Sequence, residues 1–240
     1  MGDLINEVSW SASRSYMWKK GCRLAYWWRN YGAWGGWERN SDEITRKAYI
    51  AKKSNTRFSW AGNVAHDAAK RAVTRIYRED DPTVEELQEW ARHRMIRDFR
   101  GSKAFENRKD PKRVVGLQEH EFATPNVNWD WPRDKVNRCI AGLMRSRAIT
   151  RMMTSQDLLA ADQASSFQIE DFNVWVAPDV AWRFDDGVVE EVDWKTGKPK
   201  DEDAEQVLAY MAYANAVWKV PTKQLVATLV YLDAKEGEEP

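Results

Sequence analysis

Hydrophobic positions in the first two thirds of the chain recur every three to four residues, which is the period of an amphipathic helix. Helices are expected over about residues 11–31, 56–78, 83–99 and 133–153. Thr83 and Glu86 form a capping box at the start of the third helix, and Gly32 ends the first. The stretch 101–132 is rich in Lys, Arg, Asn and Pro and is expected to be mostly loop.

Strand signals replace the helical period after about residue 166. Strands are expected over 168–184, 188–195 and 225–232, with one helix over 202–218. We expect a single domain over residues 1–240. Within it we expect three portions: 1–165 mainly helical, basic and aromatic-rich, 166–232 with a hairpin, a helix and a last strand, and 233–240 a loose tail.

The composition is typical of a globular protein. Of the 240 residues, 43% are hydrophobic and 31% are charged, which argues against disorder. No apolar run is long enough to cross a membrane, and residues 1–7 lack the pattern of a signal peptide. The two cysteines, Cys22 and Cys139, cannot form a disulfide framework or a four-thiolate metal site, so a reducing, cytoplasmic location is expected.

The net charge of zero conceals an asymmetry along the chain. Residues 1–115 hold 24 Lys and Arg against 15 Asp and Glu, whereas residues 116–240 hold 13 against 22. A basic first half favours a polyanionic partner, and the acidic second half is either a solvated face or a cation site. The chain also has 14 tryptophans, and the run 26–37 is dense in aromatic rings. Such rings either stack bases or fill a core, and different rings can do each.

The segment 174–198 is the most informative part of the chain. Asp185-Asp186-Gly187 predicts a turn, so that Phe184 pairs with Val188 and Asp179 lies opposite Asp193. Asp179, Asp193 and Lys195 then share one face of the hairpin. The other face is apolar and is expected to be core: Val174, Val176, Val180, Trp182, Phe184, Val188, Val192 and Trp194.

Two opposed carboxylates repel each other unless a cation lies between them. Hard oxygen ligands suit Mg²⁺ or Mn²⁺. Lys195 lies two residues beyond Asp193, where its ammonium group could orient a water or stabilise an oxyanion. The alternative is a solvated acidic hairpin with a surface ion pair.

The motif order resembles that of a known family. Pro178-Asp179, thirteen residues and then Asp193-Trp194-Lys195 resemble the PD-(D/E)XK nuclease superfamily. The string 193–198, Asp-Trp-Lys-Thr-Gly-Lys, resembles its RecB-like branch, which includes CRISPR-associated exonucleases. Three further elements match that branch: Gly-x-x-x-His at 62–66, Gln-x-x-x-Tyr at 206–210, and an N-terminal helix with Ser11, Ser13, Arg14, Cys22, Arg23 and Tyr26.

This resemblance implies a restriction-endonuclease-like α/β core, with a mixed central sheet flanked by helices and a helical N-terminal half. It implies a Mg²⁺- or Mn²⁺-dependent deoxyribonuclease, expected to be an exonuclease of phage or bacterial recombination, repair or defence. The implied metal ligands are His66, Asp179, Asp193 and the main-chain carbonyl of Trp194. The implied catalytic residues are Asp179, Asp193, Lys195, Gln206 and Tyr210. DNA, either single-stranded or at duplex ends, is the implied partner.

Other residues have weaker claims. Arg14, Arg23 and Lys198 are candidate phosphate contacts, although each alone is more often a surface charge. Glu170, Glu119 and Glu121 are candidate additional acids, with exposure as the alternative. Iron–sulfur relatives place three cysteines after the Gln-x-x-x-Tyr helix. No cysteine follows Cys139, so no iron–sulfur cluster is expected.

Two other classes of function remain open. The chain could be a catalytically silent nucleic-acid-binding module, or a subunit of a larger nucleoprotein complex. Binding of a carbohydrate through the tryptophans would leave the geometry of Asp179, Asp193 and Lys195 unexplained. The sequence does not decide between DNA and RNA, exo and endo action, or one and two metals. Protein partners and a homo-oligomer also stay open, and no membrane partner is expected.

Overall fold

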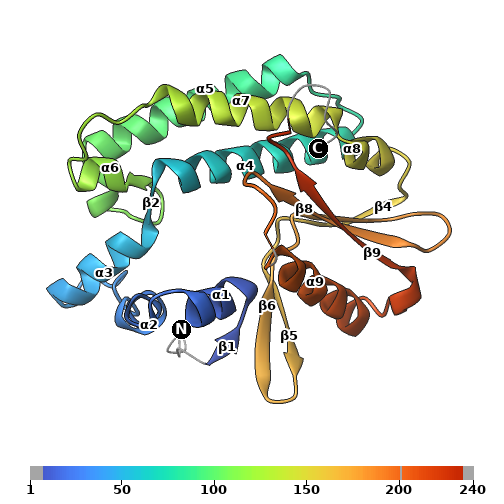
Figure 1. The fold of residues 1–240 in the computed structure, drawn as a ribbon, viewed down its shortest axis with the longest axis horizontal. Coiled ribbons are helices and arrows are strands. Elements are labelled where there is room, and N and C mark those ends of the chain that lie inside the picture. Colours follow the sequence, from blue (N-terminus) through green and yellow to red (C-terminus); the bar gives the residue numbers. More distant parts are fainter. Residues whose placement is uncertain (1–7, 201, 235–240) are drawn as a thin grey trace.

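The computed structural model describes residues 8–200 and 202–234, and it has a mixed α/β architecture (Figure 1). Helices make up most of the chain before residue 153, and the strands of the main sheet follow. The helices are α1 (Ala12–Lys20), α2 (Arg23–Trp27), α3 (Glu43–Lys53), α4 (Arg57–Tyr77), α5 (Val84–Lys103), α6 (Gln118–Glu121), α7 (Asp130–Arg145), α8 (Arg147–Met152) and α9 (Asp203–Val217). Shorter turns are the π-helix η1 (Trp28–Gly32) and the 3₁₀ helices η2 (Glu106–Arg108) and η3 (Thr222–Gln224).

The strands form three sheets. They are β1 (Ser9–Trp10), β2 (Ser54–Asn55), β3 (Gly116–Leu117), β4 (Asp157–Ala161), β5 (Ser165–Ile169), β6 (Phe172–Val176), β7 (Val180–Arg183), β8 (Val189–Lys195) and β9 (Leu225–Tyr231). The central sheet has the order β4-β7-β8-β9, in which only β8 and β9 are parallel. Smaller sheets have the orders β1-β6-β5 and β2-β3. The expected mixed sheet flanked by helices is confirmed.

Helices cover both faces of the central sheet. On one face, α4, α5 and α7 lie side by side and bury Val180, Trp182, Val192 and Trp194 in the main core (Figure 1). On the other face, α9 packs over Val189 and Leu225. Successive side chains of a strand point to opposite faces, so the odd-numbered residues of β8 face α9. The polar face of the predicted hairpin is therefore a covered face.

The predicted hairpin register is confirmed between β7 and β8. Val180 pairs with Val192 and Arg183 with Val189, and the N–H of Phe184 donates to the carbonyl of Val188 over 2.9 Å. Gly187 supplies the positive φ, 81°, that the turn requires.

The expected strand 168–184 is not continuous. It contains the end of β5, a turn at residues 170–171 and β6, and a second break at residues 177–179 separates β6 from β7, which belongs to a different sheet. Pro178 has no N–H to give to a ladder, which explains a break at this point. Consequently Val174 and Val176 do not join the main core. They pack with Phe167, Tyr210 and Tyr213 under α9.

Two expected helix boundaries and one expected loop are also corrected. The helix expected over 11–31 is interrupted at Gly21, after which α2 and η1 continue to Gly32. The helix expected over 133–153 begins at Asp130 and is divided at Ser146, whose hydroxyl caps α8. The expected loop 101–132 contains the end of α5, as well as η2, β3 and α6. Short polar elements of this kind have no extended apolar period that could be recognised.

The C-terminal segment is anchored at its start. Asp233 accepts a hydrogen bond from Lys135 at 2.5 Å and one from Arg138 at 2.8 Å, and both partners lie on α7. The remainder of the expected tail, residues 235–240, lies outside the described residues. Within the described ranges, none of the helices combines the length and the apolarity that crossing a membrane demands.

Candidate active site

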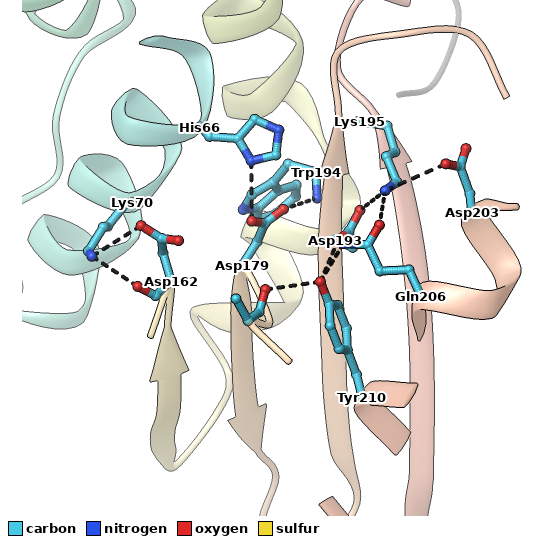
Figure 2. Close-up of polar contacts among 11 residues, drawn as sticks. His66, Lys70, Asp162, Asp179, Asp193, Trp194, Lys195, Asp203, Gln206 and Tyr210 are labelled. Atoms are coloured by element: carbon cyan, nitrogen blue, oxygen red, sulfur yellow. Dashed lines mark hydrogen bonds and ion pairs between the residues drawn. The ribbon is translucent and has the colours of Figure 1, made fainter. Parts of the chain in front are cut away.

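Four elements bring the predicted catalytic residues together at one end of the central sheet (Figure 2). Asp179 immediately precedes β7, while Asp193 and Lys195 lie at the end of β8. Because β7 and β8 are antiparallel, the start of one meets the end of the other. His66 approaches from α4, and Gln206 and Tyr210 approach from α9.

Helix α4 places its histidine firmly. The Thr56 hydroxyl caps its N-terminus by accepting the N–H of Ser59. Its inward face is rich in alanine, including Ala65 and Ala69, which lets the helix pack closely on its neighbours. A Cβ on Gly62 would lie 3.2 Å from the hydroxyl oxygen of Thr196, so α4 also comes close to the chain just beyond β8.

Asp179 links α4 to β8 through its two carboxylate oxygens. Its Oδ1 lies 3.2 Å from Nδ1 of His66, and its Oδ2 accepts the main-chain N–H of Trp194 over 2.7 Å. Burial tends to lower the pKa of His66, but the hydrogen bond to Asp179 and the charges of Asp179 and Asp193 outweigh burial and raise the pKa. The hydrogen bond to Asp179 therefore stabilises the protonated form of the His66 ring.

Asp193 is the most deeply buried of these acids, with 1% of its surface exposed. Its Oδ1 accepts hydrogen bonds from Nε2 of Gln206 at 2.8 Å and from the hydroxyl of Tyr210 at 3.2 Å. Its Oδ2 lies 2.7 Å from Nζ of Lys195. Burial raises the pKa of Asp193 and the charge of Asp179 raises it further, while Lys195 acts in the opposite direction.

Lys195 and Gln206 hold each other in place. Nζ of Lys195 donates to Oε1 of Gln206 over 2.7 Å, and the amide nitrogen of the same glutamine donates to Asp193 and to the Tyr210 hydroxyl. Tyr210 in turn donates to the carbonyl of Ala177 over 2.9 Å. Burial is the main reason that the pKa of Tyr210 is raised, so its hydroxyl stays protonated. One network therefore connects α9, β8 and the chain leading to Asp179.

Two further groups at the site were not recognised from the sequence. Oδ1 of Asp203 lies 3.6 Å from Nζ of Lys195, and its Oδ2 accepts the hydroxyl of Tyr231 over 2.9 Å. Nζ of Lys70 lies 3.2 Å from both the carbonyl oxygen and Oδ2 of Asp162 (Figure 2). Helical spacing was the available signal, because Asp203 precedes Gln206 by three residues and Lys70 follows His66 by four.

The candidate phosphate contacts lie in different settings. Arg14 donates to the carbonyl of Ser9 over 3.1 Å and also to its hydroxyl. The guanidinium of Arg23 lies 5.1 Å from the ring centroid of Trp18, and Lys198 is exposed just beyond β8. These three residues remain predictions as nucleic-acid contacts.

The three additional acids have other surroundings. Glu170 lies in the turn between β5 and β6 with φ 52°, not on a strand, and it is exposed. Glu119 accepts the main-chain N–H of Arg57 at the start of α4 over 2.8 Å. Glu121 forms an ion pair with Arg108 at 3.0 Å. These contacts give Glu119 and Glu121 structural roles in the helical portion.

The donor chemistry of this site fits a divalent cation. Oδ2 of Asp193 is buried and faces the ammonium group of Lys195 at 2.7 Å, so this carboxylate oxygen is directed at a positive charge. Lys195 supplies that charge in this conformation. Among the described residues, no three His, Cys, Asp or Glu side chains already converge closely enough to hold a metal ion. An ion bound at Oδ2 of Asp193 would displace the ammonium group of Lys195, which lies 2.7 Å from that oxygen.

Comparison with known proteins gives one positive finding. The family model of the PD-(D/E)XK nuclease superfamily matches residues 20–240, which include most of the helical portion and the whole central sheet. The matched range contains His66, Asp179, Asp193, Lys195, Gln206 and Tyr210. A search of curated proteins finds no match to the chain.

Proposed function

This chain belongs to the PD-(D/E)XK nuclease superfamily, and on that premise we propose that it is a divalent-metal-dependent deoxyribonuclease. The observation that carries the proposal is the meeting of Asp179, Asp193 and Lys195 at one end of the sheet, with His66 and Gln206 bonded to them. A single nuclease domain over residues 1–240 is part of the proposal.

We propose Mg²⁺ or Mn²⁺ as the ion, because carboxylate oxygens are the ligands these ions prefer. His66, Asp179, Asp193 and the main-chain carbonyl of Trp194 would hold it. When bound, such an ion lowers the pKa of a coordinated water and polarises the phosphate that the water attacks. We propose no iron–sulfur cluster.

The protein groups have separate tasks. Lys195 stabilises the negative charge that develops on the phosphate, or orients the attacking water. Gln206 positions both Lys195 and Asp193, since its amide contacts each of them. Tyr210 fixes the same oxygen of Asp193, and His66 fixes Asp179.

Finer features of the proposal rest on the sequence motifs. Exonuclease action in recombination, repair or defence is supported by the RecB-like string at 193–198 and by the Gln-x-x-x-Tyr spacing at 206–210. Arg14, Arg23 and Lys198 are proposed to contact phosphates. A cytoplasmic location rests on the cysteine content.

The test is a cleavage panel with labelled single-stranded and duplex DNA, linear and circular, in Mg²⁺, Mn²⁺ or EDTA. We expect metal-dependent hydrolysis that Asp193→Asn and Lys195→Met each reduce by about 100-fold or more. Asp185→Asn, a change of the same chemistry at the exposed hairpin turn, is expected to keep the activity. Linear DNA that shortens while circular DNA stays intact would establish exonuclease action.

Other outcomes decide against the proposal. Hydrolysis that is unchanged in Asp193→Asn would remove this cluster from the chemistry. Salt-dependent binding of DNA without cleavage by the unmodified protein in any metal would instead support a silent binding module.

A further inference from the structure

A groove with a volume of about 500 Å³ adjoins the catalytic network. One wall is the face of α1 that carries Tyr16, Lys19 and Lys20, and the opposite wall is the first half of α9. Val176 and Ala177 form the floor, and Trp175, whose side chain projects from the face of β6 opposite to α9, lines the edge of the groove. The groove is continuous with the active site because Gln206 and Tyr210, which bond to Asp193, are also part of its lining.

Two aromatic rings border this groove and remain accessible. Trp175 is 48% exposed and Tyr16 is 44% exposed. Trp175 lies on the face of β6 opposite to Val174 and Val176, which pack under α9, so its ring fills no core. Exposed rings beside a nuclease site offer surfaces on which bases can stack, and stacking requires bases that are not enclosed in a duplex.

Two ion pairs connect the walls of the groove. Nζ of Lys19 lies 3.3 Å from Oε1 of Glu205, and Nζ of Lys20 lies 3.5 Å from Oε2 of Glu202. Both lysines are largely exposed, and surface pairs of this kind contribute only about 0–1 kcal/mol, so a phosphate can replace the glutamates at little cost. The two glutamates weaken phosphate binding as long as they hold the lysines.

From these observations we infer that the groove between α1 and α9 binds a single-stranded stretch of the polynucleotide next to the scissile phosphate. Trp175 and Tyr16 stack on its bases, and Lys19 and Lys20 contact its phosphates. The inference rests on the proposed nuclease function and adds to it the form of the substrate that reaches Asp193 and Lys195. A duplex end must open before its terminal strand can enter.

The experiment measures the dissociation constants of fluorescent single-stranded and duplex oligonucleotides by anisotropy in EDTA, where no cleavage occurs. We expect the single strand to bind more tightly than the duplex. Trp175→Ala should weaken single-strand binding by about 5- to 100-fold, and Trp175→Phe, which keeps a ring, should retain most of it. The matched control is Phe122→Ala, because Phe122 is 71% exposed at the end of α6, outside this groove, and we expect no change there.

The charges give two further readouts. The double substitution of Lys19 and Lys20 by Gln should weaken binding and lower the slope of log affinity against log salt by about 0.7 for each lysine. The double substitution of Glu202 and Glu205 by Gln should tighten binding, because it frees the lysines and removes repulsion. A gain in affinity is not a result that misfolding produces.

The outcomes separate this inference from the nuclease proposal. If the unmodified protein cleaves DNA while Trp175→Ala leaves the single-strand affinity unchanged, the inference about the groove is wrong and the nuclease proposal is retained. Tight, Trp175-dependent binding of a single strand without cleavage in any metal would support single-strand binding in the groove and contradict the nuclease proposal. Equal loss of affinity in Phe122→Ala and Trp175→Ala, or failure of the unmodified protein to bind single strands, would also overturn the inference.

Discussion

At the scale of single residues, β8 contains three buried carboxylates with different surroundings. Glu190 accepts hydrogen bonds from Nε1 of Trp182 at 3.2 Å and from the hydroxyl of Thr228 at 2.7 Å. Asp193 is held by the catalytic network. Glu191 has no hydrogen-bond partner for either oxygen within the described residues, although it is fully buried. It lies on the face covered by α9, where burial alone raises its pKa to about 8.

We expect Glu191→Gln to stabilise the protein at pH 8. The folded-state pKa lies above the ordinary value, so the acid is neutral when folded and ionised when unfolded between about pH 4.5 and 8. Stability of the unmodified protein should therefore fall as the pH rises through this window and level off above it. The variant has no such loss. Its free energy of unfolding should exceed that of the unmodified protein by about 2–4 kcal/mol at pH 8 and by little near pH 4.5.

Urea unfolding of both proteins at pH 5 and pH 8 measures this difference. Glu170→Gln, at the exposed turn between β5 and β6, is the control and should show no comparable change. A difference that is equal at the two pH values would contradict the assignment of a buried, unpartnered acid.

We expect Gln206→Ala to lower the turnover rate by about 100-fold, because the lysine and the aspartate that it positions both lose a partner. Leu208→Ala, a change on an exposed part of α9, is the control. Single-turnover cleavage rates at saturating metal compare the two variants. A rate near that of the unmodified protein would show that Gln206 is dispensable for the positions of Asp193 and Lys195.

The acidic and basic residues of the site were predictable where a local hairpin determines their positions. The turn Asp185-Asp186-Gly187 and the alternation on either side put Asp179, Asp193 and Lys195 together. Asp203 was not predictable in the same way, because its contacts with Lys195 and Tyr231 depend on how α9 packs over the neighbouring strands β8 and β9. The burial of Glu191 has the same origin, since alternation alone made its face polar.

At the scale of elements, the sequence predicted long helices well and divided segments poorly. Helix α4 was expected over 56–78 and extends over Arg57–Tyr77. It was predictable because apolar residues recur at helical spacing throughout its 21 residues. The break at Pro178 and the interruption at Gly21 were missed, because each is a local event within a pattern that continues on both sides.

Helix α7 depends on a glycine for its approach to β9. A Cβ on Gly142 would overlap the backbone carbonyl oxygen of Leu232. Leu232 is itself buried in the main core. We expect Gly142→Ala to lower the free energy of unfolding by about 1–3 kcal/mol, because either the backbone of α7 or the backbone at Leu232 must shift to make room for the methyl group. Gly197→Ala is the control, since a Cβ there meets nothing within 4 Å. Thermal unfolding that is equal in both variants would contradict this packing of α7.

At the scale of the whole molecule, the site lies where the helical portion and the central sheet meet. The carboxylates come from the sheet, His66 comes from the helices on one face, and Gln206 and Tyr210 come from the helix on the other. Motif order indicated this assembly from the sequence. The groove beside it did not follow from any motif, because its walls are separated by about 180 residues of chain and its shape depends on packing.

An X-ray structure of crystals soaked in Mn²⁺ tests the central claim most directly. We expect anomalous density bound by Asp179 and Asp193, with Nζ of Lys195 displaced from Oδ2 of Asp193. Density that is missing at this position after a saturating soak, with Lys195 still paired to Asp193, would contradict the metal-dependent mechanism.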